Sequence, residues 1–198
     1  MTAWHGKMIA PDSDFAGAPQ LRTETKLDDG HGVVESAVLR VSAHGVVEAW
    51  VNGNRASDEV LTPGWTSYEW RLRYAEHDVT ALVAADRAES DLVLGLARGN
   101  GWYRARLGWT GRDRLYGDEL AAIAELKIRF TDGHEQVVAT DSSWMAGPSP
   151  TTANDLYNGQ DIDARLRDDA WLRPGFASAQ WVGVHEVDAD PALLEPYI

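Results

Sequence analysis

Apolar and polar residues alternate along much of the chain from Gln20 onward, with a period of two rather than the three to four of a helix. In one stretch Leu120, Leu126 and Ile128 share a face with Phe130, and the residues between them are mostly charged or small. This period is typical of half-buried strands. The predicted strands cover residues 21–27, 37–43, 46–51, 68–74, 91–97, 120–130, 135–139 and 161–167.

Turn signals separate these segments. Asn52-Gly53 and Asp132-Gly133 each follow an apolar run and predict tight hairpins. Residues 56–67 and 142–160 predict loops, and Asp78 is placed to cap one short helical turn over 78–83. A segment with Trp171 and Trp181 at its ends predicts an aromatic anchor near the C-terminus.

The pattern contains no helix beyond short helical turns. Many short strands with turns between them favour an all-β fold, and we expect a jelly-roll-like antiparallel β-sandwich of the galactose-binding-like kind. We expect an irregular lead-in over residues 1–18, one β-sandwich domain over 19–185 and an exit linker over 186–198 toward a downstream region.

Composition narrows the function. The chain has no cysteine, which excludes a thiol nucleophile and a thiolate metal site. Its formal net charge of −13 makes it a poor partner for nucleic acid or an anionic membrane. No apolar run approaches the ~20 residues of a membrane-spanning helix, and the first residues show no signal peptide, so the compartment stays open.

Recognition chemistry is concentrated in residues 98–109. Asn100, Trp102, Tyr103 and Arg104 follow a buried strand, and aromatic faces with planar polar groups suit a sugar. Strand alternation would place Trp102 and Arg104 on one face and Tyr103 on the other, so one aromatic side chain belongs in the core. Composition alone leaves packing and recognition equally open.

A metal site is the other local possibility. Asp58 and Glu59 are adjacent in the 56–67 loop, and with Asn100 they would offer calcium oxygen ligands if that loop meets the 98–109 turn. The alternative is a solvated turn. The six histidines are dispersed without metal-ligand spacing, and no two carboxylates have the placement of a glycosidase acid–base pair, which disfavours a complete enzyme.

Four segments, in order, resemble a known family. They are Val51-Asn-Gly-Asn-Arg55 with Val60-Leu-Thr-Pro-Gly-Trp-Thr-Ser-Tyr68; Tyr74-Ala-Glu-His-Asp-Val-Thr80; Gly99-Asn-Gly-Trp-Tyr-Arg104 with Leu107-Gly-Trp109; and Ala139-Thr-Asp-Ser-Ser-Trp144 with Asp155-Leu-Tyr-Asn-Gly159 and Asp163-Ala-Arg165. This set resembles the N-terminal β-sandwich domain of bacterial α-L-rhamnosidases of glycoside hydrolase family 78. It is also similar to carbohydrate-binding module family 67.

The resemblance implies L-rhamnose-containing glycosides and other domains of the same polypeptide as partners. Hydrolysis in that family belongs to carboxylates of a separate (α/α)₆ barrel, so no catalytic residue is assigned to this chain. The related module implies calcium-dependent binding of L-rhamnose, although Glu59 stands where that module has asparagine. The implied sugar-binding residues are Asp58, Asn100, Trp102, Tyr103, Arg104 and Tyr157, and the implied calcium ligands are Asp58, Glu59 and Asn100.

Two hypotheses remain after the complete enzyme is set aside. In the first, the domain is a non-catalytic module that binds rhamnose directly or through calcium. In the second, it is a structural domain that packs on the catalytic barrel and has no sugar affinity of its own. We expect the 98–109 turn to matter for binding only if it meets the 56–67 loop in space.

Overall fold

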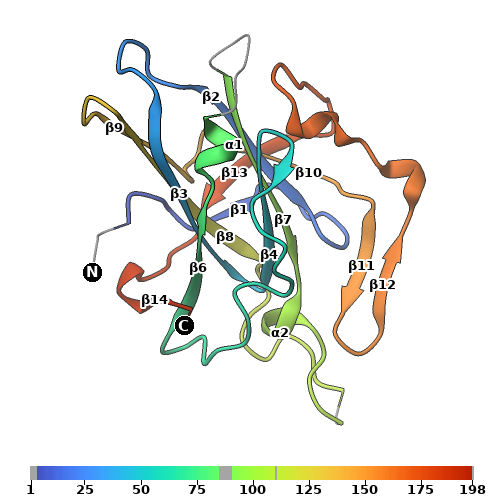
Figure 1. Ribbon diagram of the computed structural model, residues 1–198. Coiled ribbons are helices and arrows are strands. Elements are labelled where there is room, and N and C mark those ends of the chain that lie inside the picture. Colours follow the sequence, from blue (N-terminus) through green and yellow to red (C-terminus); the bar gives the residue numbers. More distant parts are fainter. Residues whose placement is uncertain (1–3, 85–90, 110, 198) are drawn as a thin grey trace.

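The computed structural model describes residues 4–84, 91–109 and 111–197 (Figure 1). The strands are β1 (Ile9–Pro11), β2 (Gln20–Lys26), β3 (Val34–His44), β4 (Val46–Val51), β5 (Asn54–Arg55), β6 (Leu72–Asp78), β7 (Asp91–Gly99), β8 (Ala121–Phe130), β9 (Glu135–Ala139), β10 (Met145–Gly147), β11 (Thr151–Asp155), β12 (Gly159–Ile162), β13 (Val182–Glu186) and β14 (Leu194–Pro196). The helical turns are α1 (Thr80–Val83), α2 (Gly101–Arg104) and the 3₁₀ turns η1 (Ala164–Leu166), η2 (Asp169–Leu172) and η3 (Pro191–Leu193).

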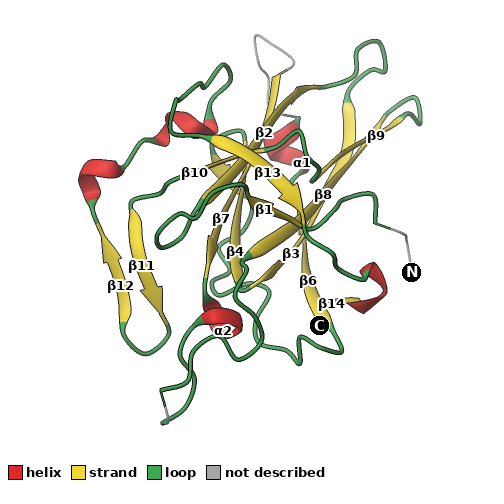
Figure 2. Cartoon of the chain, turned by 180° about the vertical axis from the view of Figure 1, so that it is seen from behind, coloured by secondary structure: helices red, strands yellow, loops and turns green. Residues whose placement is uncertain are grey.

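Hydrogen bonds join twelve of these strands in the order β14-β6-β3-β8-β1-β13-β10-β2-β7-β4-β5, with β9 beside β8. The path folds over on itself, so that β6, β3 and β8 form one layer and β2, β7 and β4 the other (Figures 1 and 2). β13 joins the layers because it pairs with β1 on one side and β10 on the other. The predicted antiparallel β-sandwich is confirmed, whereas the finer jelly-roll assignment stays a prediction.

The core lies between the two layers and follows the alternation in the sequence. Leu39 and Val41 of β3 and Leu126 of β8 face Leu94 and Leu96 of β7, and all five side chains are buried. Because successive side chains of a strand point to opposite faces, one apolar set per strand is enough to close this core. The long predicted strands therefore lie where the pattern placed them, at β2, β3, β4, β7, β8 and β9.

The strand predicted over 68–74 is displaced. Residues 68–70 form a turn in which the backbone N–H groups of Trp70 and Arg71 donate to Ser67 O, and the strand that follows is β6. The alternation of aromatic and charged residues was misleading because Tyr68 is buried in a second, smaller core beneath the sandwich, with Tyr103 and Leu120.

The 142–160 segment is not a loop, and the strand predicted over 161–167 is wrong beyond Ile162. The first contains β10 and most of a two-stranded hairpin, β11–β12, which stands beside the sandwich (Figure 1). After β12, the Asp163 side chain accepts a hydrogen bond from the Arg165 N–H and starts the 3₁₀ turn η1. The polar sequence hid these strands because all three are short, and β10 also pairs with segments far along the chain, whereas β11 and β12 pair with each other.

Both chain ends contribute strands. β1 lies inside the stretch expected to be irregular and pairs with β13 and β8. β14 lies inside the stretch expected to be a linker and pairs in parallel with β6. In the described residues, the sandwich therefore extends almost to both ends of the chain.

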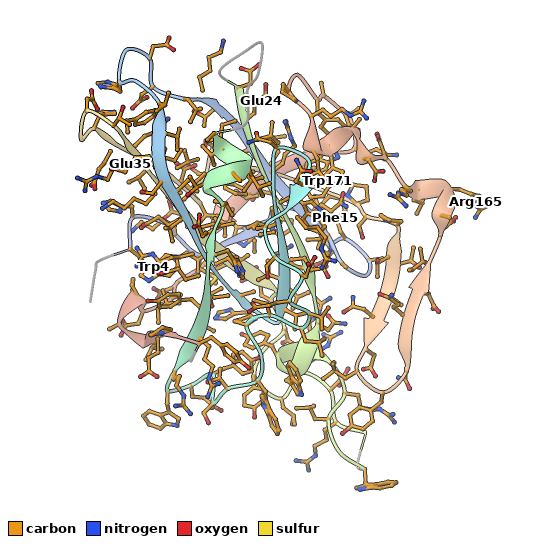
Figure 3. All side chains as sticks on the ribbon, in the orientation of Figure 1. Trp4, Phe15, Glu24, Glu35, Arg165 and Trp171 are labelled. Carbon is orange, nitrogen blue, oxygen red and sulfur yellow. The ribbon has the colours of Figure 1, made fainter. Side chains whose placement is uncertain are left out.

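The predicted aromatic anchor near the C-terminus is confirmed. Trp171 is 4% exposed and lies inward against β7, where a Cβ on Gly95 would come within 2.5 Å of its ring (Figure 3). Trp181 stacks on Trp171, with ring centroids 6.1 Å apart. Within the described ranges, no helix is long and apolar enough to cross a membrane.

Candidate functional site

The 98–109 stretch forms a helical turn at the end of β7 rather than a continuing strand. Gly101 has φ +49°, and a Cβ there would lie 2.7 Å from Val46, so only glycine fits this bend. Residues four apart on a helical turn share a face. Arg104 therefore returns to Asn100, and its Nε donates to Asn100 Oδ1 at 2.8 Å.

This turn contacts the β11–β12 hairpin. Asn100 N–H donates to Asn154 Oδ1, and Asn100 Nδ2 donates to Asn154 O, each at 2.6 Å. Asn154 has no local sequence signal, and we did not predict its role. Through Asn154, the β11–β12 hairpin holds the turn in place, although the two segments lie more than fifty residues apart in the chain.

Asp155 organises the tip of the hairpin. Its carboxylate accepts hydrogen bonds from the backbone N–H groups of Arg106, Tyr157 and Asn158, at 2.9–3.0 Å. Partial burial alone would raise the pKa of Asp155, but these three donors outweigh it and the pKa lies below its ordinary value. Asp155 therefore remains a carboxylate at neutral pH.

A cavity of about 800 Å³, which we call the polar cavity, opens beside this contact. Its charged lining is Arg104, Arg106, Arg114, Asp14, Asp113, Asp118 and Asp155. Burial, and then the charge of Arg114, lower the pKa of Arg104, which stays protonated at neutral pH. Donors and acceptors are thus mixed around one space, an arrangement that suits hydroxyl groups, which both donate and accept.

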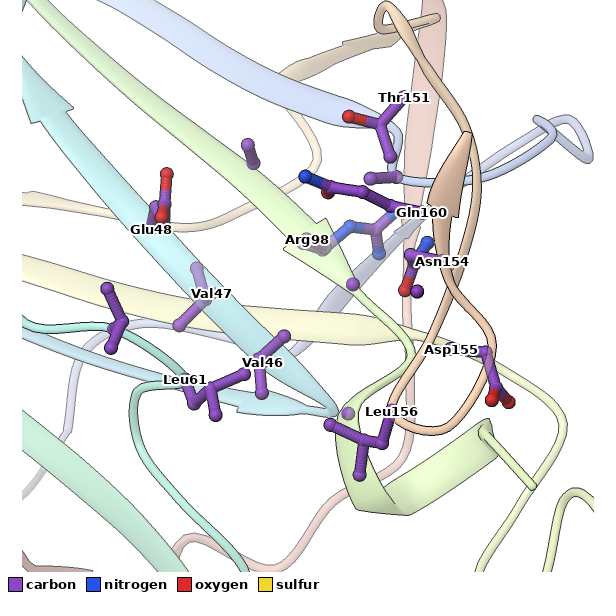
Figure 4. A pocket seen from close by; sticks show the side chains of 16 residues that line it. Val46, Val47, Glu48, Leu61, Arg98, Thr151, Asn154, Asp155, Leu156 and Gln160 are labelled. Carbon is purple, nitrogen blue, oxygen red and sulfur yellow. The ribbon is translucent and has the colours of Figure 1, made fainter. Parts of the chain in front are cut away.

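A second cavity of about 560 Å³, the apolar cavity, lies between the edge of β4 and the β11–β12 hairpin. Val46, Leu61 and Leu156 lie along one side of it, with Thr151 and Gln160 toward the other (Figure 4). Gly99 and Gly101 line this cavity, whereas Asn100 between them lines the polar cavity. The turn therefore lies at the boundary of two chemically different spaces, and Asp155 lines both of them.

Tyr157 lies beside the polar cavity. Its exposed ring is 5.2 Å from the guanidinium carbon of Arg106, and its hydroxyl accepts a hydrogen bond from Gly108 N at 3.3 Å. The structure therefore brings Tyr157 close to the turn, as the sugar-binding interpretation requires.

The two aromatic residues of the turn differ. Trp102 is half-buried, and its ring lies parallel to the exposed Trp65, with centroids 6.5 Å apart and 6° between planes. Tyr103 is buried, stacks on His44 at 4.6 Å, and has a pKa raised by burial. The expected division into one core and one outer aromatic is therefore present, and Tyr103 offers no open face to a sugar.

The 56–67 loop does meet the turn, but not through its carboxylates. Trp65 reaches Trp102, and Val60 and Leu61 line the apolar cavity with Gly99 and Gly101. Asp58 and Glu59 are exposed on the same loop.

The expected calcium ligands do not fit a calcium site as they stand. Both ends of the Asn100 amide are already bonded, to Asn154 and Arg104. Across the described part of the chain, no three His, Asp or Glu side chains cluster in a way that could hold a metal ion. Since calcium takes six to eight oxygen ligands, Asp58, Glu59 and Asn100 alone would not complete its coordination shell.

One buried cation was not predicted as a functional residue. Arg98 shares the inward face of β7 with Leu94 and Leu96, is 2% exposed, and donates from Nη1 to Leu120 O at 2.6 Å. Burial lowers its pKa to about 9, so it is still charged at neutral pH. It ties β7 to the start of β8 directly behind the turn.

Comparison with known proteins places the fold. A profile of the α-L-rhamnosidase N-terminal domain matches residues 32–197. An α-L-rhamnosidase of Streptomyces avermitilis is 34% identical over 182 residues, which are 92% of this chain and 17% of that protein. The crystal structure of native α-L-rhamnosidase from Aspergillus terreus superposes with a TM-score of 0.87 at 33% identity, over 96% of this chain and 22% of the other.

A second solved structure, the Streptomyces avermitilis enzyme complexed with L-rhamnose, has a TM-score of 0.80 at 33% identity, over 88% of this chain and 16% of the other. The fold is thus that of a β-sandwich domain found in larger glycosidases. The chain belongs to the family of α-L-rhamnosidase N-terminal domains. It spans about a fifth or less of the length of these relatives, and no (α/α)₆ barrel is present among its described residues.

Proposed function

We propose that the domain is a non-catalytic carbohydrate-binding domain of an α-L-rhamnosidase and that it contacts terminal L-rhamnose. The observation that carries this proposal is the polar cavity, which sets guanidinium donors and carboxylate acceptors around a space of about 800 Å³. A volume of about 800 Å³ lies within the range of small-molecule pockets. The polar lining suits a polyhydroxyl ligand, because hydroxyl groups both donate and accept hydrogen bonds. The L-rhamnose complex of the Streptomyces avermitilis relative supports the choice of sugar.

The residues divide into direct contacts and positioning groups. Arg104 and Arg106 donate toward the sugar hydroxyls, and the exposed ring of Tyr157 offers a face for stacking. Arg106 Nε is buried and has no hydrogen-bond partner among the described residues, so a hydroxyl there would satisfy it. Asn100 and Asn154 hold the turn in place, because their polar atoms are largely used on each other.

Isothermal calorimetry with L-rhamnose tests the proposal. We expect saturable heat for the native chain and at least about tenfold weaker binding for Arg104→Met, because a charge-assisted hydrogen bond is lost. The matched control is Arg165→Met: among the described residues Arg165 pairs only with Asp163, and it projects from the outer edge of the molecule (Figure 3). Absence of heat with the native chain at millimolar L-rhamnose would refute the proposal, and unchanged melting temperatures would show that both variants are folded.

Calcium is tested in the same titration. Because Asn100 is already bonded and Asp58 and Glu59 are exposed, we expect the affinity to be the same with added calcium and with chelator. Loss of binding in chelator would instead support a calcium site at Asp58, Glu59 and Asn100.

A second candidate function is structural, with the domain packing on the other domains of its polypeptide. The observation that favours it is the exposure of large aromatic side chains, with Trp70 79%, Trp109 105% and Trp65 54% exposed. Exposed apolar surface of this kind is typical of interfaces. In a longer polypeptide, Trp70→Ser would then lower the melting temperature, while in the isolated domain it would change little.

A further inference from the structure

Leu61 is held in an unusual backbone conformation. Its φ of +59° lies in the left-handed region, which is unfavourable for any residue with a Cβ, and its side chain is 47% exposed. Two backbone hydrogen bonds fix the loop around it, from Val47 N to Thr62 O at 2.7 Å and from Gly64 N to Leu61 O at 2.8 Å. Strained backbone conformations cluster at active sites, ligand clamps and switch regions, so the surroundings of Leu61 are a candidate contact surface.

Leu61 is presented to the apolar cavity. It lies with Val46 and Leu156 along one side of that cavity, which has a volume of about 560 Å³ (Figure 4). Val60, 71% exposed, extends the same apolar wall. A partly open, apolar space of this size would gain from an apolar group that displaces water.

The apolar and polar cavities are neighbours. Asp155 lines both, and consecutive residues of one turn alternate between them, with Gly99 and Gly101 on the apolar side and Asn100 on the polar side. A ligand that occupied both would need a polyhydroxyl part directly joined to an apolar part. A glycoside with an apolar aglycone has this construction.

We propose that the apolar cavity is an aglycone subsite, so that the domain binds rhamnosides with apolar aglycones more tightly than free L-rhamnose. The sugar lies in the polar cavity, and the group linked to its anomeric carbon lies against Leu61, Val46 and Leu156. This inference rests on the proposed sugar site and adds the class of glycoside that the site prefers.

The experiment compares three ligands by calorimetry: L-rhamnose, methyl α-L-rhamnoside and phenyl α-L-rhamnoside. We expect the phenyl glycoside to bind at least about tenfold more tightly than the methyl glycoside, because burial of the ring removes apolar surface from water. Leu61→Gly should remove most of this advantage and leave the affinity for L-rhamnose unchanged. Glycine adopts a positive φ without strain, so this variant keeps the loop conformation and deletes only the side chain.

Two further variants complete the design. Leu156→Ser should also reduce the phenyl advantage, since Leu156 lies on the same wall from the hairpin side. Leu166→Gly is the matched control, because Leu166 is 52% exposed and lies outside both cavities. It should keep the full preference for the phenyl glycoside.

Equal affinities for the methyl and phenyl glycosides, or a phenyl advantage that persists in Leu61→Gly, would overturn the subsite and leave the sugar site intact. Absence of binding for all three ligands would overturn both. A phenyl glycoside that binds while L-rhamnose does not, with loss in Leu61→Gly, would support the apolar subsite and contradict the proposed sugar specificity.

Discussion

Asn154 shows how a single side chain positions the candidate site. Its Oδ1 and its backbone carbonyl each accept a hydrogen bond from Asn100, at 2.6 Å, and the pair closes the turn at the end of β7 against the hairpin. Its own Nδ2 is buried without a partner among the described residues. Asn154 therefore serves as an acceptor here, and its loss would leave the Asn100 N–H without its partner.

We predict that Asn154→Ala lowers the free energy of unfolding by about 1–2 kcal/mol, the usual effect of leaving a partly buried donor unsatisfied. Asn158→Ala is the control, because Asn158 is exposed and accepts from Arg106 only at 3.5 Å. It should change stability by less than about 0.5 kcal/mol. Urea titration followed by tryptophan fluorescence measures both, and equal effects would contradict the role given to Asn154.

At the scale of elements, a histidine links three segments that the sequence pattern treated separately. His185 of β13 contacts Asp12, next to β1, through Nδ1 at 3.2 Å, and Glu119, ahead of β8, through Nε2 at 2.9 Å. The hydrogen bond to Glu119, and then that to Asp12, raise the pKa of His185 above its ordinary value of 6.5. When His185 is protonated, its imidazolium forms ion pairs with Asp12 and Glu119 that hold β13, the strand that joins the two layers.

The raised pKa fixes the sign of the pH dependence. Stability from this contact is fully present below the unfolded pKa near 6.5 and is lost as the pH rises through the higher folded pKa. We predict that the native chain exceeds His185→Gln in unfolding free energy at pH 5.5 by less than about 1 kcal/mol, because the groups are half exposed. The difference should shrink toward pH 9, and a difference that grows with pH would contradict the assignment. NMR titration of His185 in Glu119→Gln should show a lower pKa than in the native chain.

The elements also show which parts of the fold could be predicted from the sequence. Strands with a long alternation, such as β3 and β8, were predicted because their own residues carry the pattern. β10, β13 and β14 have three to five residues each and form only through partners far along the chain, so no local period marks them. The role of Gly95 also depends on a distant segment. The sequence shows a glycine in an apolar run, but it does not show that the Trp171 ring packs against this glycine.

The candidate site, like the strands, could be predicted only where a segment's own residues mark it. Asn100, Arg104 and Tyr157 do come together, because their segments carry recognisable residue types. Their partners Asn154 and Asp155 lay in a segment interpreted as a loop. Arg106 is a candidate because it lines the polar cavity, and Leu61 because of its positive φ. Neither property can be predicted from the order of residues in the chain.

At the scale of the whole molecule, the C-terminal segment that was expected to be a linker packs on the sandwich. β14 pairs in parallel with β6, Leu194 is 5% exposed, and Tyr197 N donates to Tyr74 O at 2.8 Å. The Arg73 guanidinium carbon also lies 5.4 Å from the Tyr197 ring centroid. These contacts are those of an integral edge strand, whereas a linker would leave β6 as the edge.

Deletion of the chain from Asp190 onward separates these two interpretations. We predict a loss of at least about 2 kcal/mol in unfolding free energy, because the burial of Leu194 alone is worth that much. We also predict concentration-dependent association, because the exposed β6 would present unpaired N–H and C=O groups to another copy. Urea unfolding and light scattering measure the two effects, with Glu195→Ala as a control at an exposed position of the same strand. A linker would be lost without either effect, and unchanged stability with a monomeric product would return residues 190–198 to that interpretation.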